Sequence, residues 1–266
     1  MSWRLKWAMQ QFFDRQLRLR NRELLNNPAA YYASILLKMV PGIYPPPLQL
    51  RFRHSPHSFP VGSFMTAFIY KEIFADSDYD IALAMPRPSI LDVGANTGLF
   101  ALRMKQLYPE ARIACFEPEE NNFTQLERLI RDNQLEGVRA IRKGLGAKTG
   151  TAVLYLHPQN IGGHSIIRQG RDWKPRTIEL LSLADALWTL PDGICHLMKL
   201  DCEGAEYEII RSMDLSLAAR VHCVLFEGSA HLYNVEELDT HLKSLGYMLE
   251  RRHGLAIARS MLSAAA

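Results

Sequence analysis

An acidic residue beside a glycine-containing turn is the first feature of the sequence that could do chemistry. Asp92 lies in the apolar run Ile90–Phe100, which passes through a G-x-x-x-G turn at Gly94 and Gly98. A glycine turn between a strand and a helix lets a ligand approach the backbone closely. A phosphate-binding turn would read G-x-G-x-x-G, and a carboxylate next to a phosphate is unfavourable. The pattern favours a ligand that carries an ammonium and a sulfonium, S-adenosylmethionine, with its methionine end on this loop.

A second acidic residue, Glu117, ends the next apolar run, Ile113–Phe116. An acid at this place in an α/β fold accepts hydrogen bonds from both ribose hydroxyls of a nucleoside. The same acid occurs in NAD sites, and it could instead cap a helix ahead of Pro118. Glu117 alone therefore does not separate the alternatives. Together with Asp92 and the missing phosphate fingerprint, it favours a methyl donor over a dinucleotide.

Three more acidic residues, Asp201, Glu203 and Glu206, come directly after the fourth apolar run. Ligands of open α/β sheets bind at the carboxyl ends of the strands, so we expect Asp201 and Glu203 to face the same cleft as Asp92. A carboxylate close to an acceptor hydroxyl can take its proton while the oxygen attacks a methyl group. Glu206 instead suits the dipole of the helix that follows.

A further carboxylate and two histidines complete the candidates. Glu227 ends the fifth apolar run, and with Asp201 and Glu203 it could hold a divalent cation such as Mg²⁺, which would acidify an acceptor hydroxyl. Nothing in the sequence requires this metal, and we assign no metal ligands. His164 and His231 lie in loops that could cover the cleft, where each is either a general base or an exposed loop histidine. We include His164 among the catalytic candidates.

Parallel strands separated by helices are needed to bring these residues together. From residue 88 onward, short apolar runs alternate with amphipathic segments in that way. The predicted strands are Ser89–Val93, Arg112–Phe116, Val138–Arg142, Cys195–Leu200 and Val221–Phe226. The predicted helices are Leu99–Leu107, Asn121–Asn133, Ala205–Met213 and Val235–Ser244. Tyr247–Arg251 and Leu255–Arg259 predict a closing antiparallel hairpin.

An insertion and an N-terminal extension surround this core. Residues 151–190 interrupt the alternation, and Ala152–His157 and Thr177–Leu181 within them predict extra strands. We predict a helical extension over residues 1–60 and the main domain over residues 61–266. The extension comprises helices at 1–27 and Ala29–Val40 and a Pro-rich connector, Pro41–Pro47, and Gly62–Phe74 predicts a helix that leads into the main domain.

The extension is basic, although the formal net charge of +3 is too small to indicate nucleic-acid binding. Residues 1–22 mix basic side chains with Trp3, Trp7, Phe12 and Phe13, a combination that suits an anionic membrane surface. The same helix would equally pack its aromatic side on residues 29–88. We favour this packing over peripheral membrane contact.

The composition is that of a globular protein, since 48% of the residues are hydrophobic and 22% are charged. The four cysteines form no C-x-x-C pair and are expected to be buried thiols. The start lacks the apolar segment of a signal peptide, and the most apolar window, Ala29–Tyr44, is broken by Lys38 and Pro41. We therefore expect a cytoplasmic protein. Zincin, α/β-hydrolase and P-loop motifs are all missing.

Taken together, the motifs resemble the FkbM family of S-adenosylmethionine-dependent methyltransferases over Tyr79–Arg259. The segments that carry the resemblance are Leu91–Gly98, Phe116-Glu117-Pro118, Gly144-Leu145-Gly146, Asn160–Ser165, Lys199–Glu206 and Phe226-Glu227. The resemblance implies a class I methyltransferase fold, an α/β Rossmann-like architecture whose mostly parallel seven-stranded sheet has helices on both faces. It also implies O-methylation of sugar or polyketide-type hydroxyls.

The resemblance further implies which residues form the site. The cofactor would be held by Asp92, Gly94, Ala95, Asn96 and Gly98 at its methionine end, by Glu117 and Pro118 at the ribose, and by Asp201. The catalytic candidates are Asp201, Glu203, Glu227 and His164. We predict an S-adenosylmethionine-dependent O-methyltransferase acting on a small-molecule or glycan acceptor, namely a saccharide, glycolipid or related natural product. An NAD-dependent oxidoreductase and a non-catalytic nucleoside-binding module remain alternatives.

Overall fold

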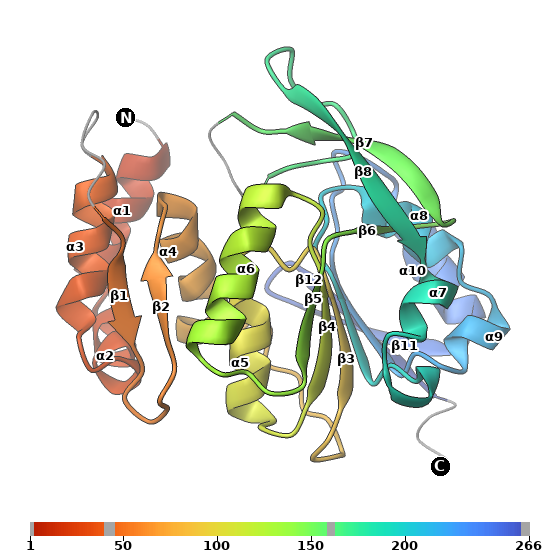
Figure 1. The fold of residues 1–266 in the computed structure, drawn as a ribbon, viewed down its shortest axis with the longest axis horizontal. Coiled ribbons are helices and arrows are strands. Elements are labelled where there is room, and N and C mark those ends of the chain that lie inside the picture. Colours follow the sequence, from red (N-terminus) through yellow and green to blue (C-terminus); the bar gives the residue numbers. More distant parts are fainter. Residues whose placement is uncertain (1–2, 40–45, 159–162, 262–266) are drawn as a thin grey trace. The chain divides into compact units, whose positions relative to one another are not determined.

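The computed structural model describes residues 3–39, 46–158 and 163–261, and the chain forms two compact units, Met1–Asp80 and Ile81–Ala266 (Figure 1). The division after Asp80 differs from the predicted extension over residues 1–60. The reason is that residues 48–75 pack with the N-terminal helices in one unit. Most of the predicted Pro-rich connector, Pro41–Pro47, lies outside the described residues.

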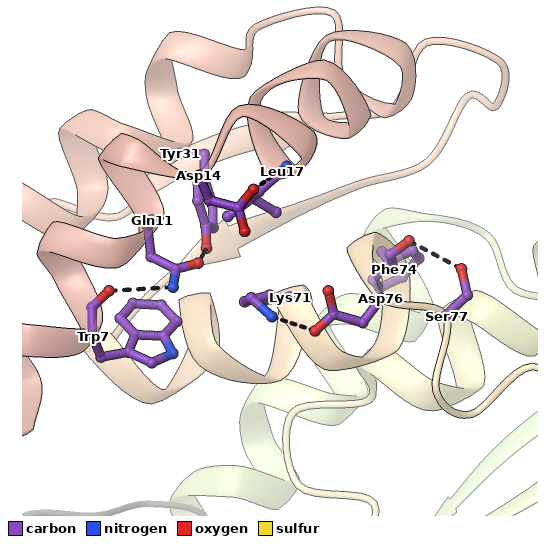
Figure 2. A network of polar contacts seen from close by, with 9 residues as sticks. All are labelled: Trp7, Gln11, Asp14, Leu17, Tyr31, Lys71, Phe74, Asp76 and Ser77. Atoms are coloured by element: carbon purple, nitrogen blue, oxygen red, sulfur yellow. Dashed lines mark hydrogen bonds and ion pairs between the residues drawn. The ribbon is translucent and has the colours of Figure 1, made fainter. Parts of the chain in front are cut away.

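The first unit is built of helices and one hairpin. Its elements are α1 (Trp3–Phe13), α2 (Arg15–Leu24), α3 (Pro28–Met39), β1 (Leu48–Arg51), β2 (Ser58–Val61), α4 (Phe64–Tyr70) and the π-helical turn η1 (Lys71–Ala75). Strands β1 and β2 pair antiparallel and had no counterpart in the sequence analysis. The prediction of one continuous helix over residues 1–27 is wrong. Asp14 has extended backbone angles and accepts a hydrogen bond from the Leu17 amide at 3.0 Å, so it caps a new helix (Figure 2).

Two of the N-terminal aromatic side chains pack inside this unit. Trp7 meets Phe64 with ring centroids 4.8 Å apart, and Phe12 lies 5.3 Å from Tyr32. This is the packing predicted for the N-terminal segment, whereas Phe13 remains 75% exposed. Contact with a membrane surface was the less favoured alternative, and the packing of these two side chains does not test it. Among the described helices, none combines the length and apolar character needed to cross a bilayer.

Polar side chains connect the helices of the first unit. Gln11 donates to the Trp7 carbonyl and accepts from the Tyr31 hydroxyl, both at 3.2 Å (Figure 2). Lys71 pairs with Asp76 at the end of η1 (Figure 2). The bond with Tyr31 links α1 to α3, and because Gln11 is buried, the two bonds together offset the cost of removing its amide from water.

The second unit contains the predicted sheet. Its seven strands are β3 (Ser89–Val93), β4 (Arg112–Phe116), β5 (Val138–Ile141), β9 (Leu197–Leu200), β10 (Cys223–Glu227), β11 (Tyr247–Arg252) and β12 (Leu255–Ser260). They lie in the order β11-β12-β10-β9-β3-β4-β5, and β12 runs antiparallel to β10 and β11 while the other pairs are parallel. The predicted parallel strands and the closing hairpin are therefore confirmed.

Helices cover both faces of this sheet, as predicted. The helices α5 (Leu99–Leu107) and α6 (Glu120–Asp132) lie on one side, and α7 (Leu183–Leu187), α8 (Ala205–Arg211), α9 (Leu215–Ala218) and α10 (Val235–Ser244) lie towards the other (Figure 1). Fully buried side chains of β3, β9 and β10 pack with those of α8 and α10 in one hydrophobic core. Because these side chains are fully buried, water is excluded from this face of the sheet, and the ends of neighbouring strands are held at fixed positions relative to one another.

The predicted insertion forms a second, three-stranded sheet. It consists of β6 (Gly144–Gly146), β7 (Gly150–Leu156) and β8 (Lys174–Ser182) in the order β6-β8-β7. Strand β7 overlaps the predicted run Ala152–His157 except for His157, and β8 contains the run Thr177–Leu181. The short 3₁₀ turn η2 (Pro191–Gly193) follows α7. Strand β6 was not predicted, because three residues with two glycines carry no strand pattern. The sheet therefore begins before the predicted start of the insertion at residue 151.

Asn21 is expected to be a critical polar residue of the first unit. Its buried side chain donates to the Tyr32 hydroxyl at 3.1 Å and accepts from the Tyr70 hydroxyl at 2.9 Å. The substitution Asn21→Ala should lower the free energy of unfolding by about 1–3 kcal/mol, because it leaves the buried Tyr70 hydroxyl without an acceptor. Urea unfolding measures this, with the exposed Gln16→Ala in the same helix as control. Equal loss in both variants would contradict the assignment.

Candidate functional site

The candidate site lies where the strand order reverses. Strand β3 has β4 on one side and β9 on the other, so the loops after β3 and β9 leave the sheet side by side. Open α/β sheets bind ligands at such a switch point. Asp92, near the end of β3, and the loops that carry Glu117 and Asp201 therefore lie at the same edge of the sheet, as the sequence predicted.

The loop after β3 lies against the loop after β9. Gly94 has a φ of +75°, and a Cβ atom added there would be 1.9 Å from the carbonyl oxygen of Asp201. Only glycine fits this close approach. Asn96 also adopts a left-handed conformation, and its side chain accepts a hydrogen bond from the Thr97 amide at 2.7 Å. The loop then enters α5 through Gly98, at a φ of +89°.

The side chain of Lys199, in β9, contacts both of these loops. Its ammonium donates to the Gly94 carbonyl at 2.8 Å and pairs with Asp92 at 3.3 Å and with Asp201 at 3.4 Å. It is buried and also lies 5.9 Å from the centre of the Phe100 ring. Burial alone would lower the pKa of Lys199, but the two carboxylates outweigh it and raise that pKa. The ammonium therefore stays charged.

Asp92 faces this ammonium rather than an open site. Its side chain is completely buried, and apart from the ion pair neither of its oxygens accepts a hydrogen bond from the described residues. A buried carboxylate in that position depends on one cation for its charge. Asp92 thus acts on the loop through Lys199.

Glu117 holds the first loop from the adjacent strand end. One carboxylate oxygen accepts from the Asn96 amide at 2.9 Å, and the other accepts from the Glu119 amide at 2.8 Å. Burial raises the pKa of Glu117 to about 7, although both backbone donors oppose that shift. Because each oxygen retains a second lone pair, the carboxylate can also accept from a ribose. Pro118, which follows it, is half-buried.

Four carboxylates line a cavity of about 220 Å³ beside Asp201. The residues that line it are Asp201, Glu203, Glu206, Glu227, Gly228, Ser229 and His231. Three of the four predicted catalytic residues are thus brought together. Glu206 has a structural role as well, since its carboxylate accepts from the Cys202 amide at 2.5 Å and the Gly204 amide at 2.7 Å.

Burial and neighbouring negative charges raise the pKa values of Glu203 and Glu227. Burial, together with the neighbouring Asp201, Glu206 and Glu227 carboxylates, raises the pKa of Glu203 to about 7. Burial also raises the pKa of Glu227, and Asp201 and Glu206 add to the effect. Glu203 is therefore poised to gain or lose a proton near neutral pH, the property that a general base requires.

Ser165, in the connection between β7 and β8, fixes the turn that carries Glu203. Its hydroxyl donates to the Glu203 carbonyl at 2.5 Å, and Glu203 has a φ of +52°. Residues with side chains adopt this conformation only when their surroundings impose it. The second sheet therefore helps to aim the Glu203 carboxylate.

His164 does not join the cavity. Its Nδ1 accepts a hydrogen bond from the His157 amide at 3.0 Å, and burial lowers its pKa, so the ring is neutral and directed to its own loop. The histidine that lines the cavity is His231. The predicted catalytic role of His164 therefore gains no support from the geometry of the described residues.

Metal ligation gains no support from the described geometry either. Among residues 3–39, 46–158 and 163–261, no group of three His, Cys, Asp or Glu side chains is arranged to hold a metal ion. Asp201, Glu203 and Glu227 line the cavity without forming such a group.

The donor set nevertheless fits S-adenosylmethionine. Glu117, directly after β4, suits ribose hydroxyls, and Asp201, which lies against Gly94 of the first loop, suits the positive charge at the methionine end of the cofactor. The first loop approaches the β9 loop so closely that no side chain fits at Gly94, so the two loops together form one end of the site.

The comparisons with known proteins agree with this chemistry. A model of the methyltransferase FkbM domain matches residues 92–249, more than half of the chain. The chain belongs to the FkbM methyltransferase family. It is thus an S-adenosylmethionine-dependent methyltransferase, and the match gives no support to the NAD-dependent alternative.

Several relatives of this FkbM chain carry methyltransferase names. Methyltransferase sdnD of Sordaria araneosa is 36% identical over 177 residues, 55% of this chain and 68% of the relative. Methyltransferase 1 of Beauveria bassiana is 30% identical and covers 63% of this chain and 75% of the relative. The 2-O-methyltransferase NoeI of Sinorhizobium fredii is 30% identical over 48% of this chain and 58% of the relative.

A solved structure shares the fold. The crystal structure of the methyltransferase FkbM from Methylobacillus flagellatus matches 97% of this chain with a TM-score of 0.51 and 13% identity. The matched region spans 62% of that protein's length. At this identity the likeness shows the fold alone, the class I methyltransferase architecture that the sequence predicted.

Sequence reasoning missed two residues that organise this FkbM site. Lys199 was recorded as part of a motif without a role, although a lysine at the end of an apolar run next to acidic residues is a signal for a buried ion pair. Ser165 also belongs to a motif, but its role could not be predicted, because its partner is the Glu203 carbonyl, far away in the sequence.

We expect Lys199→Met to lower the free energy of unfolding by about 3–5 kcal/mol, because the substitution leaves the buried Asp92 carboxylate unpaired. Adding Asp92→Asn should recover part of this loss, since no buried charge then lacks a partner. Chemical denaturation measures both effects, and Lys148→Met, at an exposed position, is the control. A Lys199→Met protein as stable as the control would show that the ion pair does not support the loops.

We expect Glu117→Ala to weaken binding of S-adenosylhomocysteine by about 1–3 kcal/mol, the usual cost of losing a charged hydrogen-bond partner. Calorimetric titration measures the affinity, and the exposed Glu120→Ala, in the following helix, should bind normally. Unchanged affinity in Glu117→Ala would remove Glu117 from the cofactor site.

Proposed function

We propose that this chain transfers the methyl group of S-adenosylmethionine to a hydroxyl oxygen of a saccharide, glycolipid or related natural product. The observation that carries the proposal is the cavity at the ends of β9 and β10, where Glu203 has a pKa of about 7 among three other carboxylates. A hydroxyl must lose its proton as it attacks, and a carboxylate with this pKa accepts protons efficiently at neutral pH.

The cofactor would lie over the first loop. In the proposal, Gly94, Ala95, Asn96 and Gly98 hold the methionine end, and Glu117, with Pro118 beside it, holds the ribose. Asp92 keeps this loop in place through Lys199. When bound, S-adenosylmethionine supplies an electrophilic methyl group on a sulfonium.

The acceptor would lie in the carboxylate cavity. In the proposal, Glu203 takes the proton of the acceptor hydroxyl while the oxygen forms its bond to the methyl carbon and the carbon–sulfur bond breaks. The products are the methyl ether, S-adenosylhomocysteine and protonated Glu203. Because the displacement is in line, much of the rate depends on how Asp201 and Glu227 orient the acceptor.

A relative supports oxygen as the methylated atom. The protein from Sinorhizobium fredii is named a 2-O-methyltransferase, and it shares 30% identity with this chain over 149 residues. The name applies to that protein, and it agrees with a cavity of hydrogen-bond acceptors that suits a polyhydroxyl compound.

The acceptor class can be tested by direct product detection. Enzyme and methyl donor are incubated with sugar-containing acceptors, and each acceptor is examined for the mass increase of one methyl group. A methyl ether on a sugar hydroxyl supports the proposal, whereas methylation only of amines contradicts it. Cofactor binding without any product would favour the non-catalytic alternative.

We expect Glu203→Gln to lower kcat by a factor of about 10²–10⁴, because the amide cannot accept the proton. In the unmodified enzyme, kcat/KM should rise with pH through about 7, since Glu203 acts as a base only after it loses its own proton. This rise should be absent in Glu203→Gln, and Glu208→Gln, an exposed change on α8, should preserve it.

The same assay separates the carboxylate base from metal catalysis. If Mg²⁺ activated the acceptor, EDTA would abolish methyl transfer. A Glu203→Gln enzyme with normal kcat and an unchanged pH profile would contradict the role of Glu203.

A further inference from the structure

The connection between β7 and β8 carries an exposed group of basic side chains. We call Arg168, Arg171, Lys174 and Arg176 the basic arm; all four are exposed, and Asp172 is the one acidic residue among them in the sequence. Figure 1 shows the β7–β8 hairpin extending past the ends of the parallel strands of the second unit. The arm therefore projects from the body of the unit.

The strand register gives the direction of two arm residues. Lys174 is paired with Leu156 and Arg176 with Leu154, and directly opposed residues share one face of an antiparallel pair. Leu154 is buried, as is Ile178, two residues beyond Arg176 on the same face. Lys174 and Arg176 thus continue the inward face of the hairpin beyond the point where the hydrophobic core ends.

The arm is attached to the turn that carries Glu203. Besides the bond from Ser165 to the Glu203 carbonyl, a Cβ atom on Gly204 would lie 2.9 Å from Ile167. Ser165 itself pairs with the backbone of Tyr155 in β7, at 2.8 and 3.1 Å. The segment leading into the arm therefore contacts the backbone of the turn whose Glu203 side chain lines the cavity.

The arm has cations available for a ligand. Within the described part of the chain, the side chains of Lys174 and Arg176 form no ion pair. Arg168 is ordered by its own loop, since it donates to the carbonyls of Gly170 and Arg171 and lies 5.9 Å from the centre of the Tyr155 ring. Guanidinium and ammonium groups held close together are typical of sites for phosphate oxygens.

The carboxylate cavity and the basic arm carry charges of opposite sign. The cavity has four carboxylates and would repel a phosphate, whereas the arm attracts one. An acceptor with an uncharged hydroxyl at one end and a phosphate at the other matches both surfaces at once. A neutral saccharide would match only the cavity.

We propose that Lys174 and Arg176, assisted by Arg168, bind the phosphate or pyrophosphate group of a soluble acceptor whose hydroxyl enters the carboxylate cavity. This inference rests on the proposed function, because it assigns a second group to the same acceptor. It makes the acceptor a phosphorylated saccharide or a comparable phosphate ester.

The test is a calorimetric titration of the S-adenosylhomocysteine-bound protein with pyrophosphate. We expect binding by the unmodified protein and an affinity at least about tenfold lower in Lys174→Gln/Arg176→Gln, because two charge-assisted contacts are lost. The control, Lys148→Gln/Arg139→Gln, removes the same charge from two exposed positions that both precede β7, and should change the affinity less than about twofold. S-adenosylhomocysteine should bind all three proteins equally.

Other outcomes would overturn the inference. The inference is wrong if the unmodified protein does not bind pyrophosphate, or if the arm and control variants lose affinity for pyrophosphate equally. If vesicles of phosphatidylcholine with phosphatidic acid bind in a way that depends on the arm residues, the phosphate belongs to a lipid. If single-stranded RNA binds more tightly than pyrophosphate, the ligand is a nucleic acid. Either result would overturn the proposal of a soluble acceptor. The titration does not depend on methyl transfer, so failure of the arm and failure of the O-methyltransferase proposal are separate results.

Discussion

The ammonium of Lys199 is the point on which the site depends. It bonds to the backbone of the first loop at Gly94 and to the carboxylates of Asp92 and Asp201, which belong to two neighbouring strands. In a buried environment these charges cannot be left unpaired without a cost of several kcal/mol. The two loops are consequently held in one arrangement, in which Gly94 closely approaches the Asp201 carbonyl.

The carboxylates in and around this ion pair have different roles because their surroundings differ. Asp92 is buried beneath the loop, Glu206 is occupied by two backbone amides, and Glu203 faces the cavity. The charges of neighbouring groups and burial leave Glu203 with a pKa near neutrality. The second sheet contributes through Ser165, so a part of the chain that is absent from the parallel core sets the geometry of the proposed base.

The parallel core was readable from the sequence because its central strands are runs of buried apolar residues. Ser89–Val93 and Arg112–Phe116 were predicted with their observed bounds, as was the helix Leu99–Leu107. Elements without such a pattern were missed: β6 is too short, β1 and β2 follow a run of prolines, and the break at Asp14 lies between two helical segments. At that break, a single capping hydrogen bond outweighs the helical pattern on both sides.

The sequence by itself determined the family, the order of the strands along the chain and the acidic residues that follow them, because these depend on local apolar runs and on residue types. Only the tertiary structure decided which acids meet. It separated Asp92 from the cavity, joined Asp201, Glu203 and Glu227 around it, and turned His164 away. The physical reason is that pairing between buried groups depends on strand order and on contacts between segments far apart in the chain, such as Ser165 with Glu203, which no local pattern encodes.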